Sequence, residues 1–369
     1  MLLIGLFYIV VPLLLIGVIA FKRQANILIW IFTILSFGSV IVYLWVTARW
    51  EIVSVYFRPI FPILYLIACV IGYKRIKIPE TPPKKIVMIF GITLHVILIV
   101  FFSGLNWFSF RGYITPENVI DLASPFHNGK QIVLHGGTSP FINGHFHVKP
   151  QNHALDIVGL NNLGMRASSI QGGSDLSKYV IYGQAIYSPL NGTVIAVEDK
   201  YEDQSPPTTD IEHLAGNYIL IESEGVEILL AHLKKGSIAV KQGDIVTTNT
   251  LLGQVGNTGN TSEPHLHIHV EKGGETIAIL NGIAVPFTIN KQYLVRGDII
   301  KLEEGKCIAW PWMNDRPFMY IGVQANSFRK KALRGTWVLI KDMGNHHIYE
   351  VLDIDLKTID WTKYSYEYD

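Results

Sequence analysis

Histidine is the side chain best suited to metal and acid–base chemistry near neutral pH, and the histidines of this chain are clustered. The candidates fall in three groups, which are His145, His147 and His153, then His232, and then His265, His267 and His269. Members of the last group alternate with apolar residues, so on a β-strand their three imidazoles lie on one face. Such a face presents two ligands, or one ligand and one acid–base group, to a single metal ion.

Two further polar positions interrupt runs that are otherwise typical of buried strands. Asp156 lies within Asn152–Val158, which we predict to be a strand with Asp156 facing away from the side of its apolar neighbours. His232 ends the apolar run Leu229–Ala231. A carboxylate or an imidazole at such a position is unfavourable to bury unless it is paired or bound to a metal. We therefore interpret both residues as functional.

Zinc is the metal that explains these residue types together. It takes histidine nitrogen and carboxylate oxygen, and a catalytic zinc site keeps one position open for water beside three protein ligands. The ion lowers the pKa of that water and polarises a carbonyl, while unligated histidines orient the water or stabilise an oxyanion. The sequence contains no His-Glu-x-x-His motif, which excludes a thermolysin-type arrangement.

The elements that must position these residues are short strands. From Arg111 onward, runs rich in Val, Ile and Tyr alternate with turns rich in Gly, Asn, Pro and Ser, a pattern typical of antiparallel β proteins. The clearest runs are Ala185–Pro189, Gly192–Val197, Asn217–Glu222, Glu227–His232 and His265–Glu271. We predict a long surface loop at Asp199–Gly216, and further strands at Thr336–Ile340 and His347–Asp353.

Before Arg111 the chain is far more apolar. Hydrophobic residues make up 49% of the whole chain and charged residues only 17%, against about 25% charged residues in soluble proteins. The excess lies in four runs, each close to the roughly 20 residues with which a helix spans a bilayer. The runs are Leu2–Phe21, Ile27–Ala48, Ile52–Tyr73 and Ile86–Phe102. Arg58 and two prolines near the start of the third run predict a short or bent span there.

Charges in the loops predict the orientation of these spans. Lys22 and Arg23 follow the first span and the basic stretch Lys74–Lys85 follows the third, whereas the segments after the second and fourth carry few basic residues. The positive-inside rule then places the first and third loops in the cytoplasm. We expect a multi-pass protein of the cell membrane with its β region extracytoplasmic. His95, inside the fourth span, is predicted to form helix-packing hydrogen bonds.

Composition excludes other classes of protein. The net charge of +1 argues against a nucleic-acid partner, because nucleic-acid-binding proteins normally carry a basic excess. The two cysteines, Cys69 and Cys307, are too few for a disulfide framework.

Several motifs occur in order between His145 and Pro286. They are Ala154-Leu155-Asp156-Ile157, Ser188-Pro189-Leu190-Asn191-Gly192-Thr193-Val194, Gly216-Asn217-Tyr218-Ile219, Leu230-Ala231-His232-Leu233, Val240-Lys241-Gln242-Gly243-Asp244-Ile245-Val246 and Gly256–His267. In order and spacing this segment resembles the M23 family of zinc metallopeptidases, the lysostaphin and LytM-like peptidoglycan endopeptidases. The Pro264-His265-Leu266-His267 element is the most specific of these signatures.

The resemblance implies a fold, a cofactor and a substrate. The fold is an antiparallel β domain forming a groove with a Zn²⁺ site, and the reaction is hydrolysis of amide bonds in the peptide part of peptidoglycan. Asp156 and His267 match the family's zinc ligands, whereas His265 and His232 match the residues that act on water and oxyanion. The expected partners are peptidoglycan peptides and the membrane.

One position departs from the family pattern. The family's first ligand is a histidine four residues before the aspartate, where this chain has Asn152. The neutral carbonyl oxygen of Asn152 is a weaker donor to zinc than imidazole or carboxylate. A third ligand must therefore come from elsewhere, or the site is degenerate.

Four histidines are candidates for this third ligand. His269 lies about 7 Å along the strand from His267 and so points past the metal, while His153 faces away from Asp156 if the strand is regular. His145 and His147 precede the Asp156 strand in a loop that can fold back over the site. We favour His145, because Gly144 before it permits a close approach, Phe146 can anchor the loop, and related sequences keep an Asn-x-His element there.

The predicted fold is thus an N-terminal bundle of four transmembrane helices at residues 1–110, followed by a mainly antiparallel M23-like metallopeptidase domain at 111–299. We predict a β-rich segment at residues 300–369, and the sequence does not indicate its role. Two rival functions stay open. Asn152 is compatible with a non-catalytic relative that binds wall peptides or regulates another hydrolase, and the Gly-Asp-Ile-Val and Asn-Gly-Thr-Val turns also occur in lipoyl-like carrier modules. A carrier has no use for the His/Asp set.

Overall fold

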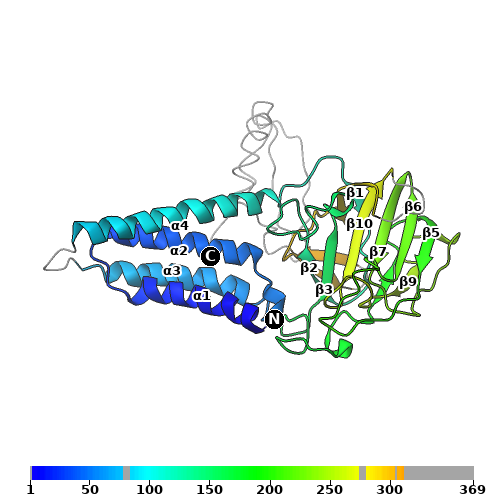
Figure 1. Ribbon diagram of the computed structural model, residues 1–369, viewed down its shortest axis with the longest axis horizontal. Helices are drawn as coiled ribbons and strands as arrows, with labels where there is room; N and C mark the ends of the chain where they lie inside the picture. Colours follow the sequence, from blue (N-terminus) through cyan, green and yellow to red (C-terminus); the bar gives the residue numbers. More distant parts are fainter. Residues whose placement is uncertain (1, 78–83, 274–279, 304–305, 311–369) are drawn as a thin grey trace, which may run out of the picture. The chain divides into compact units, whose positions relative to one another are not determined.

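The structure is a computed structural model that describes residues 2–77, 84–273, 280–303 and 306–310. Within these ranges four helices are long and apolar enough to cross a membrane (Figure 1). They are α1 (Leu2–Phe21), α2 (Ile27–Thr47), α3 (Phe57–Lys74) and α4 (Lys85–Arg111). The predicted strands at Thr336–Ile340 and His347–Asp353 lie outside the described residues. The helices agree with the predicted order of four spans.

Polar side chains inside the helical region bond to one another. The Nδ1 atom of His95 on α4 lies 2.7 Å from the Ser36 hydroxyl, and its Nε2 atom lies 3.4 Å from that of Thr33, both on α2. A polar side chain that cannot reach water is satisfied in this way by a neighbouring helix. His95 is therefore a helix-packing residue, as predicted.

Two helix boundaries differ from the predicted runs. Helix α3 begins at Phe57 rather than Ile52, because Trp50–Ile52 form a separate 3₁₀ turn and Arg58 is drawn inward to donate to the Gly297 carbonyl at 3.0 Å. Helix α4 continues to Arg111, well past Phe102. Its last turns carry Asn106, whose Nδ2 donates to the Ser39 carbonyl on α2 at 2.9 Å, so polar residues there still pack against a helix.

The β region is built on one large antiparallel sheet. Among the described residues ten strands pair in the order β14-β13-β2-β3-β10-β7-β6-β5-β8, with β11 also on β10. The strands are β2 (Lys130–His135), β3 (Leu155–Gly159), β5 (Gly192–Glu198), β6 (Tyr218–Ser223), β7 (Val226–Ala231), β8 (Ile245–Val246), β10 (Leu266–Lys272), β11 (Ile283–Ala284), β13 (Ile299–Glu303) and β14 (Lys306–Trp310). The predicted fold class, apolar helices followed by a mainly antiparallel β domain, is confirmed.

Two small pairs complete the β region. Strand β1 (Ile120–Leu122) pairs in parallel with β12 (Phe287–Ile289), and β4 (Ala185–Tyr187) pairs antiparallel with β9 (Leu251–Gln254). Strand β13 follows residue 298 and pairs with β2, and β14 pairs with β13 in turn. The large sheet therefore extends into the part of the chain that the predicted division assigned to the C-terminal segment.

Alternation along the central strands separates an apolar face from a polar one. On β10, Leu266, Ile268 and Val270 enter the main apolar core, which also contains Leu155 and Ile157 of β3. The residues between them therefore face the other side of the sheet. These residues are the histidines and the aspartate singled out in the sequence, and they are buried rather than solvated.

Strand β3 is shorter than the predicted run. It begins at Leu155, because Lys149–Gln151 form a 3₁₀ turn that carries Pro150 and leaves Asn152 and His153 outside the strand. The expectation that Asn152 and His153 lie on a regular strand is therefore wrong, although the predicted orientation of Asp156 holds. A proline just inside such a turn cannot donate to a β ladder, which explains the late start.

Candidate metal centre and active site

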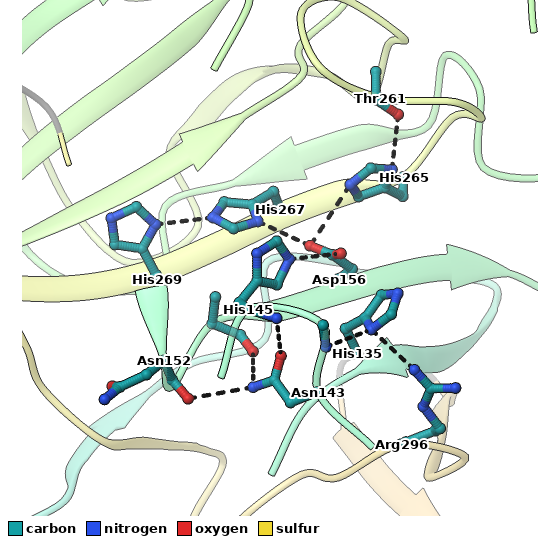
Figure 2. Close-up of polar contacts among 12 residues, drawn as sticks. His135, Asn143, His145, Asn152, Asp156, Thr261, His265, His267, His269 and Arg296 are labelled. Carbon is teal, nitrogen blue, oxygen red and sulfur yellow. Dashed lines mark hydrogen bonds and ion pairs between the residues drawn. The ribbon is translucent and has the colours of Figure 1, made fainter. Parts of the chain in front are cut away.

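The centre of the site is a cross-strand pair on the polar face of the sheet. His267 on β10 is the register partner of Asp156 on β3, and its Nδ1 atom lies 2.8 Å from Asp156 Oδ1 (Figure 2). On its other side His267 is in register with Ala231 of β7. The residue after Ala231 is His232. Strand register thus brings three distant segments of the chain to one place.

A loop brings His145 to the same carboxylate. Its Nε2 atom lies 2.8 Å from Asp156 Oδ2. Asn143 organises this loop: its Oδ1 accepts from the His145 amide at 3.0 Å, and its Nδ2 donates to the Gly137, Asn152 and Ala154 carbonyls. An Asn side chain that bonds the backbone on both sides fixes a turn without regular structure. Asn143 and His145 are the two named residues of the Asn-x-His element in the sequence, and these hydrogen bonds are its structural role.

The three side chains form a compact donor set. One donor atom from each of His145, Asp156 and His267 lies within 4.8 Å of the others. Two imidazole nitrogens and one carboxylate oxygen are a donor set that Zn²⁺ takes in catalytic sites. The residues therefore fit a zinc ion chemically.

The pKa shifts of His267 and Asp156 suit metal binding. Burial lowers the pKa of His267 to about 3, so its ring is neutral at neutral pH, as a ligand must be. Burial alone would raise the pKa of Asp156, but the nearby His145 and His265 and the bonds from His145 and His267 hold it well below its usual range. Burial would lower the pKa of His145, but the Asp156 carboxylate outweighs it and raises that pKa.

The other candidate ligands lie elsewhere. His147 is exposed and packs edge-on against Phe146. His153, in the turn before β3, is outside the donor set. The Asn152 side chain is directed away from the His145–Asp156–His267 cluster in Figure 2, while its carbonyl accepts from Asn143. Among the candidates for the third ligand, the geometry favours His145.

His265 stands at the edge of this donor set. Its Nδ1 atom lies 2.9 Å from the Glu263 carbonyl and 3.0 Å from the Thr261 hydroxyl, and its Nε2 atom lies 3.6 Å from Asp156 Oδ1. A carbonyl acceptor at Nδ1 fixes the tautomer with the proton on that nitrogen. The Nε2 atom is turned towards the Asp156 side.

His232, which directly follows β7, flanks the same region. Its Nδ1 atom donates to the Thr258 carbonyl at 2.8 Å, and its ring centre lies 4.7 Å from that of His265. Burial, followed by the two neighbouring imidazoles, lowers the pKa of His232 well below its usual range. Its backbone φ is +64°, a conformation that costs a non-glycine residue about 1–2 kcal/mol. Strain of this kind clusters at functional sites.

His269 belongs to the support of His267. It is fully buried, and its Nδ1 atom lies 2.9 Å from His267 Nε2. Its own Nε2 faces Glu271 Oε1 at 3.8 Å, while the Glu271 carboxylate accepts from the Leu280 and Gly282 amides. The contact from His269 orients the imidazole whose Nδ1 faces Asp156. Partners of this type fix the ring and the tautomer of a metal ligand.

His135 is not among the residues predicted for the site. It ends β2, and its Nδ1 accepts from the Gly144 amide at 2.9 Å and from Arg296 Nη2 at 3.0 Å. Burial, reinforced by the Arg296 charge, lowers its pKa to about 3, so the ring is neutral and its Nδ1 is an acceptor. A Cβ on Gly144 would lie 3.0 Å from the His135 ring, which explains the glycine before His145. No spacing signal links His135 to the other histidines.

A buried ion-pair network is also absent from the sequence-based predictions. Glu263 accepts from Arg166 Nε at 2.6 Å and from Arg49 Nη2, and Arg49 Nε in turn donates to Glu51 at 2.7 Å. Burial alone would raise the pKa of Glu263, but the two guanidinium groups hold it at about 2. Glu263 stands inside a motif of the sequence, but its partners lie far away along the chain.

The chain matches one protein family over part of its length. Residues 170–279 match the sequence profile of peptidase family M23. The matched segment contains His232, His265 and His267 but begins after His145 and Asp156.

Three solved structures illustrate what the chain is similar to, and two of them are described as peptidases. A zinc-containing peptidase from Vibrio cholerae is 27% identical over 29% of this chain and 27% of its own, with a TM-score of 0.21. LytU is 28% identical over 26% of this chain and 57% of its own, with a TM-score of 0.21. The catalytic domain of lysostaphin from Staphylococcus simulans is 17% identical over 40% of this chain and 83% of its own, with a TM-score of 0.24. The chain thus spans about a quarter of the first relative and just over half of the second.

Proposed function

We propose that this chain, which carries a domain of peptidase family M23 at residues 170–279, is a zinc-dependent endopeptidase that hydrolyses amide bonds in the peptide part of peptidoglycan. The observation that carries the proposal is the meeting of His145, Asp156 and His267 within 4.8 Å, with His232 and His265 at their side. This combination of three donors and two further imidazoles has the parts of a hydrolytic metal site.

The three donors would hold the ion from three directions. His145 contributes Nε2, His267 contributes Nδ1, and Asp156 contributes its carboxylate. When bound, Zn²⁺ supplies Lewis-acid polarisation of the scissile carbonyl and lowers the pKa of a water molecule towards neutrality. Asp156 and His267 are almost fully buried, whereas the His145 side chain keeps 22% of its surface exposed and that of His265 keeps 10%. A substrate therefore approaches from the side of His145 and His265.

The flanking histidines move protons. In His265 and in His232 the Nδ1–H group is held by a backbone carbonyl, so in the neutral form of each ring Nε2 is the basic nitrogen. An Nε2 atom of this kind accepts a proton from the attacking water and, once protonated, gives it to the departing amine. The lowered pKa of His232 keeps its ring neutral until the reaction delivers the proton.

Several features support an extracytoplasmic position. Lys74 ends α3 and Lys85 begins α4, while Lys22 and Arg23 follow the end of α1. These basic residues lie at the helix ends opposite to the α2–α3 connection. The α2–α3 connection contacts the β domain, for example through the 2.9 Å bond from the Arg166 amide to the Glu51 carbonyl. The α2–α3 connection and the β domain therefore lie on the same side of the membrane. The positive-inside rule makes that side the outer one, where peptidoglycan lies.

The rival function, a non-catalytic relative, depended on Asn152 at the position of the family's first ligand. His145 offers Asp156 and His267 a third donor from a different segment of the chain. The donor set therefore has three members although position 152 holds asparagine in place of histidine. The peptidase proposal accounts for His232 and His265 as well, which a purely binding domain does not require.

The test is digestion of purified cell walls by the full chain in detergent micelles. We expect new amino groups to be released with the zinc-loaded protein, to be lost on treatment with a chelator, and to return with added Zn²⁺. An Asp156→Ala variant should release none. Binding of walls without any release of amino groups would favour the non-catalytic function instead.

A further inference from the structure

The short connection between α2 and α3 is buried in the β region. Residues 48–55, here called the α2–α3 loop, include Trp50, Ile52 and Val55, whose exposed fractions are 2%, 0% and 1%. These side chains share an apolar cluster with Ile132 and Leu134 of β2. The backbone is joined as well, since the Val55 amide donates to the Gly164 carbonyl at 2.9 Å. A loop that only crossed the membrane surface would be solvated.

From this loop one polar route leads to His265. The Arg49 side chain donates to Glu51 and, through Nη2, to Glu263. The Glu263 side chain is only 4% exposed and is held on its other oxygen by Arg166. The carbonyl of the same Glu263 accepts from Thr261 Oγ1 at 2.7 Å and from His265 Nδ1. Arg49 thus fixes the residue that sets the orientation and the tautomer of His265.

A second route leads to His145. Arg296 donates through Nη1 to the Thr47 carbonyl at the end of α2, at 2.9 Å. Its Nη2 bonds His135 Nδ1, which also accepts from the amide of Gly144, the residue before His145 (Figure 2). Its Nε donates to the Ile142 carbonyl at 2.9 Å in the same loop. Arg296 therefore links the membrane helix to the loop that presents His145.

We propose that the α2–α3 loop is a built-in part of the active site, with Arg49 and Arg296 as positioning residues for His265 and His145. The membrane region then completes the site, in addition to anchoring it. This inference rests on the proposed function for its kinetic consequences but not for its structural ones. The arrangement also restricts activity to molecules whose helical hairpin is folded against the β domain.

The test uses the full chain in detergent micelles, with soluble fragments of purified peptidoglycan as substrate. Arg49→Ala should lower kcat by roughly 10- to 100-fold, the usual effect of removing a supporting partner, with zinc content and KM unchanged. Arg49→Lys keeps the charge but loses the two-pronged geometry, so it should restore only part of kcat. Lys130→Ala is the matched control, because Lys130 bonds Tyr56 at the same junction at 3.2 Å without reaching the site.

Hydrogen exchange separates this inference from the proposed function. Arg49→Ala should speed exchange of the backbone amides between Thr261 and His267, and Lys130→Ala should not. If wild-type protein cuts no peptidoglycan but exchange changes in this way, the proposed function fails and the coupling stands. The coupling is wrong if Arg49→Ala keeps both wild-type kcat and wild-type exchange. If Arg49→Ala fails to fold, the coupling is wrong when Arg49→Lys keeps both wild-type kcat and wild-type exchange. A drop in stability with unchanged kcat per folded molecule also overturns it, because that result assigns Arg49 a purely structural role.

Discussion

Asp156 and His267 are direct neighbours across the β3–β10 ladder, and their side chains meet at 2.8 Å although they stand 111 positions apart in the chain. Their positions are set by strand register rather than by a flexible loop. A slip of either strand by one residue would turn the side chain on that strand into the apolar core and separate the pair. Because Leu266 and Ile268 fill that core, the register is strongly specified. The two ligands of the proposed metal centre are therefore rigidly placed.

The first prediction concerns the third ligand. His145→Ala should lower zinc affinity and activity together, because it removes the Nε2 donor that lies 2.8 Å from Asp156. Asn152→Ala should keep zinc bound, because that side chain is directed away from the donor set. Zinc titration of the two variants with a competing chelator checks both results. Retention of zinc by His145→Ala, together with its loss in Asn152→Ala, would show that position 152 supplies the ligand.

A second prediction separates catalysis from metal binding. Replacing His232 or His265 by Ala should lower turnover by roughly 10²- to 10⁴-fold, the scale for a positioned acid–base group. The zinc content should stay at the wild-type level, because neither side chain belongs to the compact donor set. Metal analysis beside turnover measurement gives the answer. Loss of zinc from either variant would make that residue a ligand and contradict the assigned role.

The third prediction concerns the support of His267. His269→Ala should weaken zinc binding by roughly 10- to 100-fold, since it removes the acceptor 2.9 Å from His267 Nε2. His147→Ala is the control, because His147 is exposed and outside the donor set. Affinity is measured by competition with a chelator at neutral pH. Equal zinc affinity in the two variants would mean that His269 is only a core residue.

A fourth prediction follows from the depressed pKa of Glu263. Its folded-state pKa is about 2 against an ordinary 4.5, because Arg49 and Arg166 outweigh burial. The stability that this carboxylate contributes is therefore fully present above about pH 4.5 and is lost as pH falls towards 2. In metal-free protein, Glu263→Gln should lower Tm at neutral pH, and its difference from wild type should shrink over this pH window. A difference that stays constant across the window would show that the ion pairs do not act through the Glu263 charge.

Much of the site follows from local pattern. The alternation in His265–His269 predicts a strand with histidines on one face, and the isolated Asp156 between Leu155 and Ile157 predicts a buried functional carboxylate. These inferences work because strand periodicity and the high free energy of burying a charge are local properties. The length and hydropathy of the four apolar runs are local properties as well, so these runs are predicted as helices without knowledge of any tertiary contact.

The rest depends on long-range geometry. Arg49 and Glu263 are 214 positions apart, and Arg296 reaches Thr47 across 249. Nothing in a periodic pattern links such residues. His145 could be favoured from the flexible Gly144 and the Asn-x-His element, but the loop path depends on Asn143 bonding three carbonyls. The predicted start of β3 is wrong for a similar reason, because the 3₁₀ turn at Lys149–Gln151 overrides the alternating pattern.

The measurement that tests the central claim most directly is wall digestion by the full zinc-loaded chain in water enriched in heavy oxygen, followed by mass spectrometry of the fragments. Hydrolysis of an amide by an activated water places the heavy oxygen in a new peptide carboxyl group and leaves a new amino group on the other fragment. We predict labelled peptide fragments with the wild-type protein and none with Asp156→Ala or after chelation. Intact wall peptides with the zinc-loaded wild-type protein, or label confined to the glycan strands, would contradict the account.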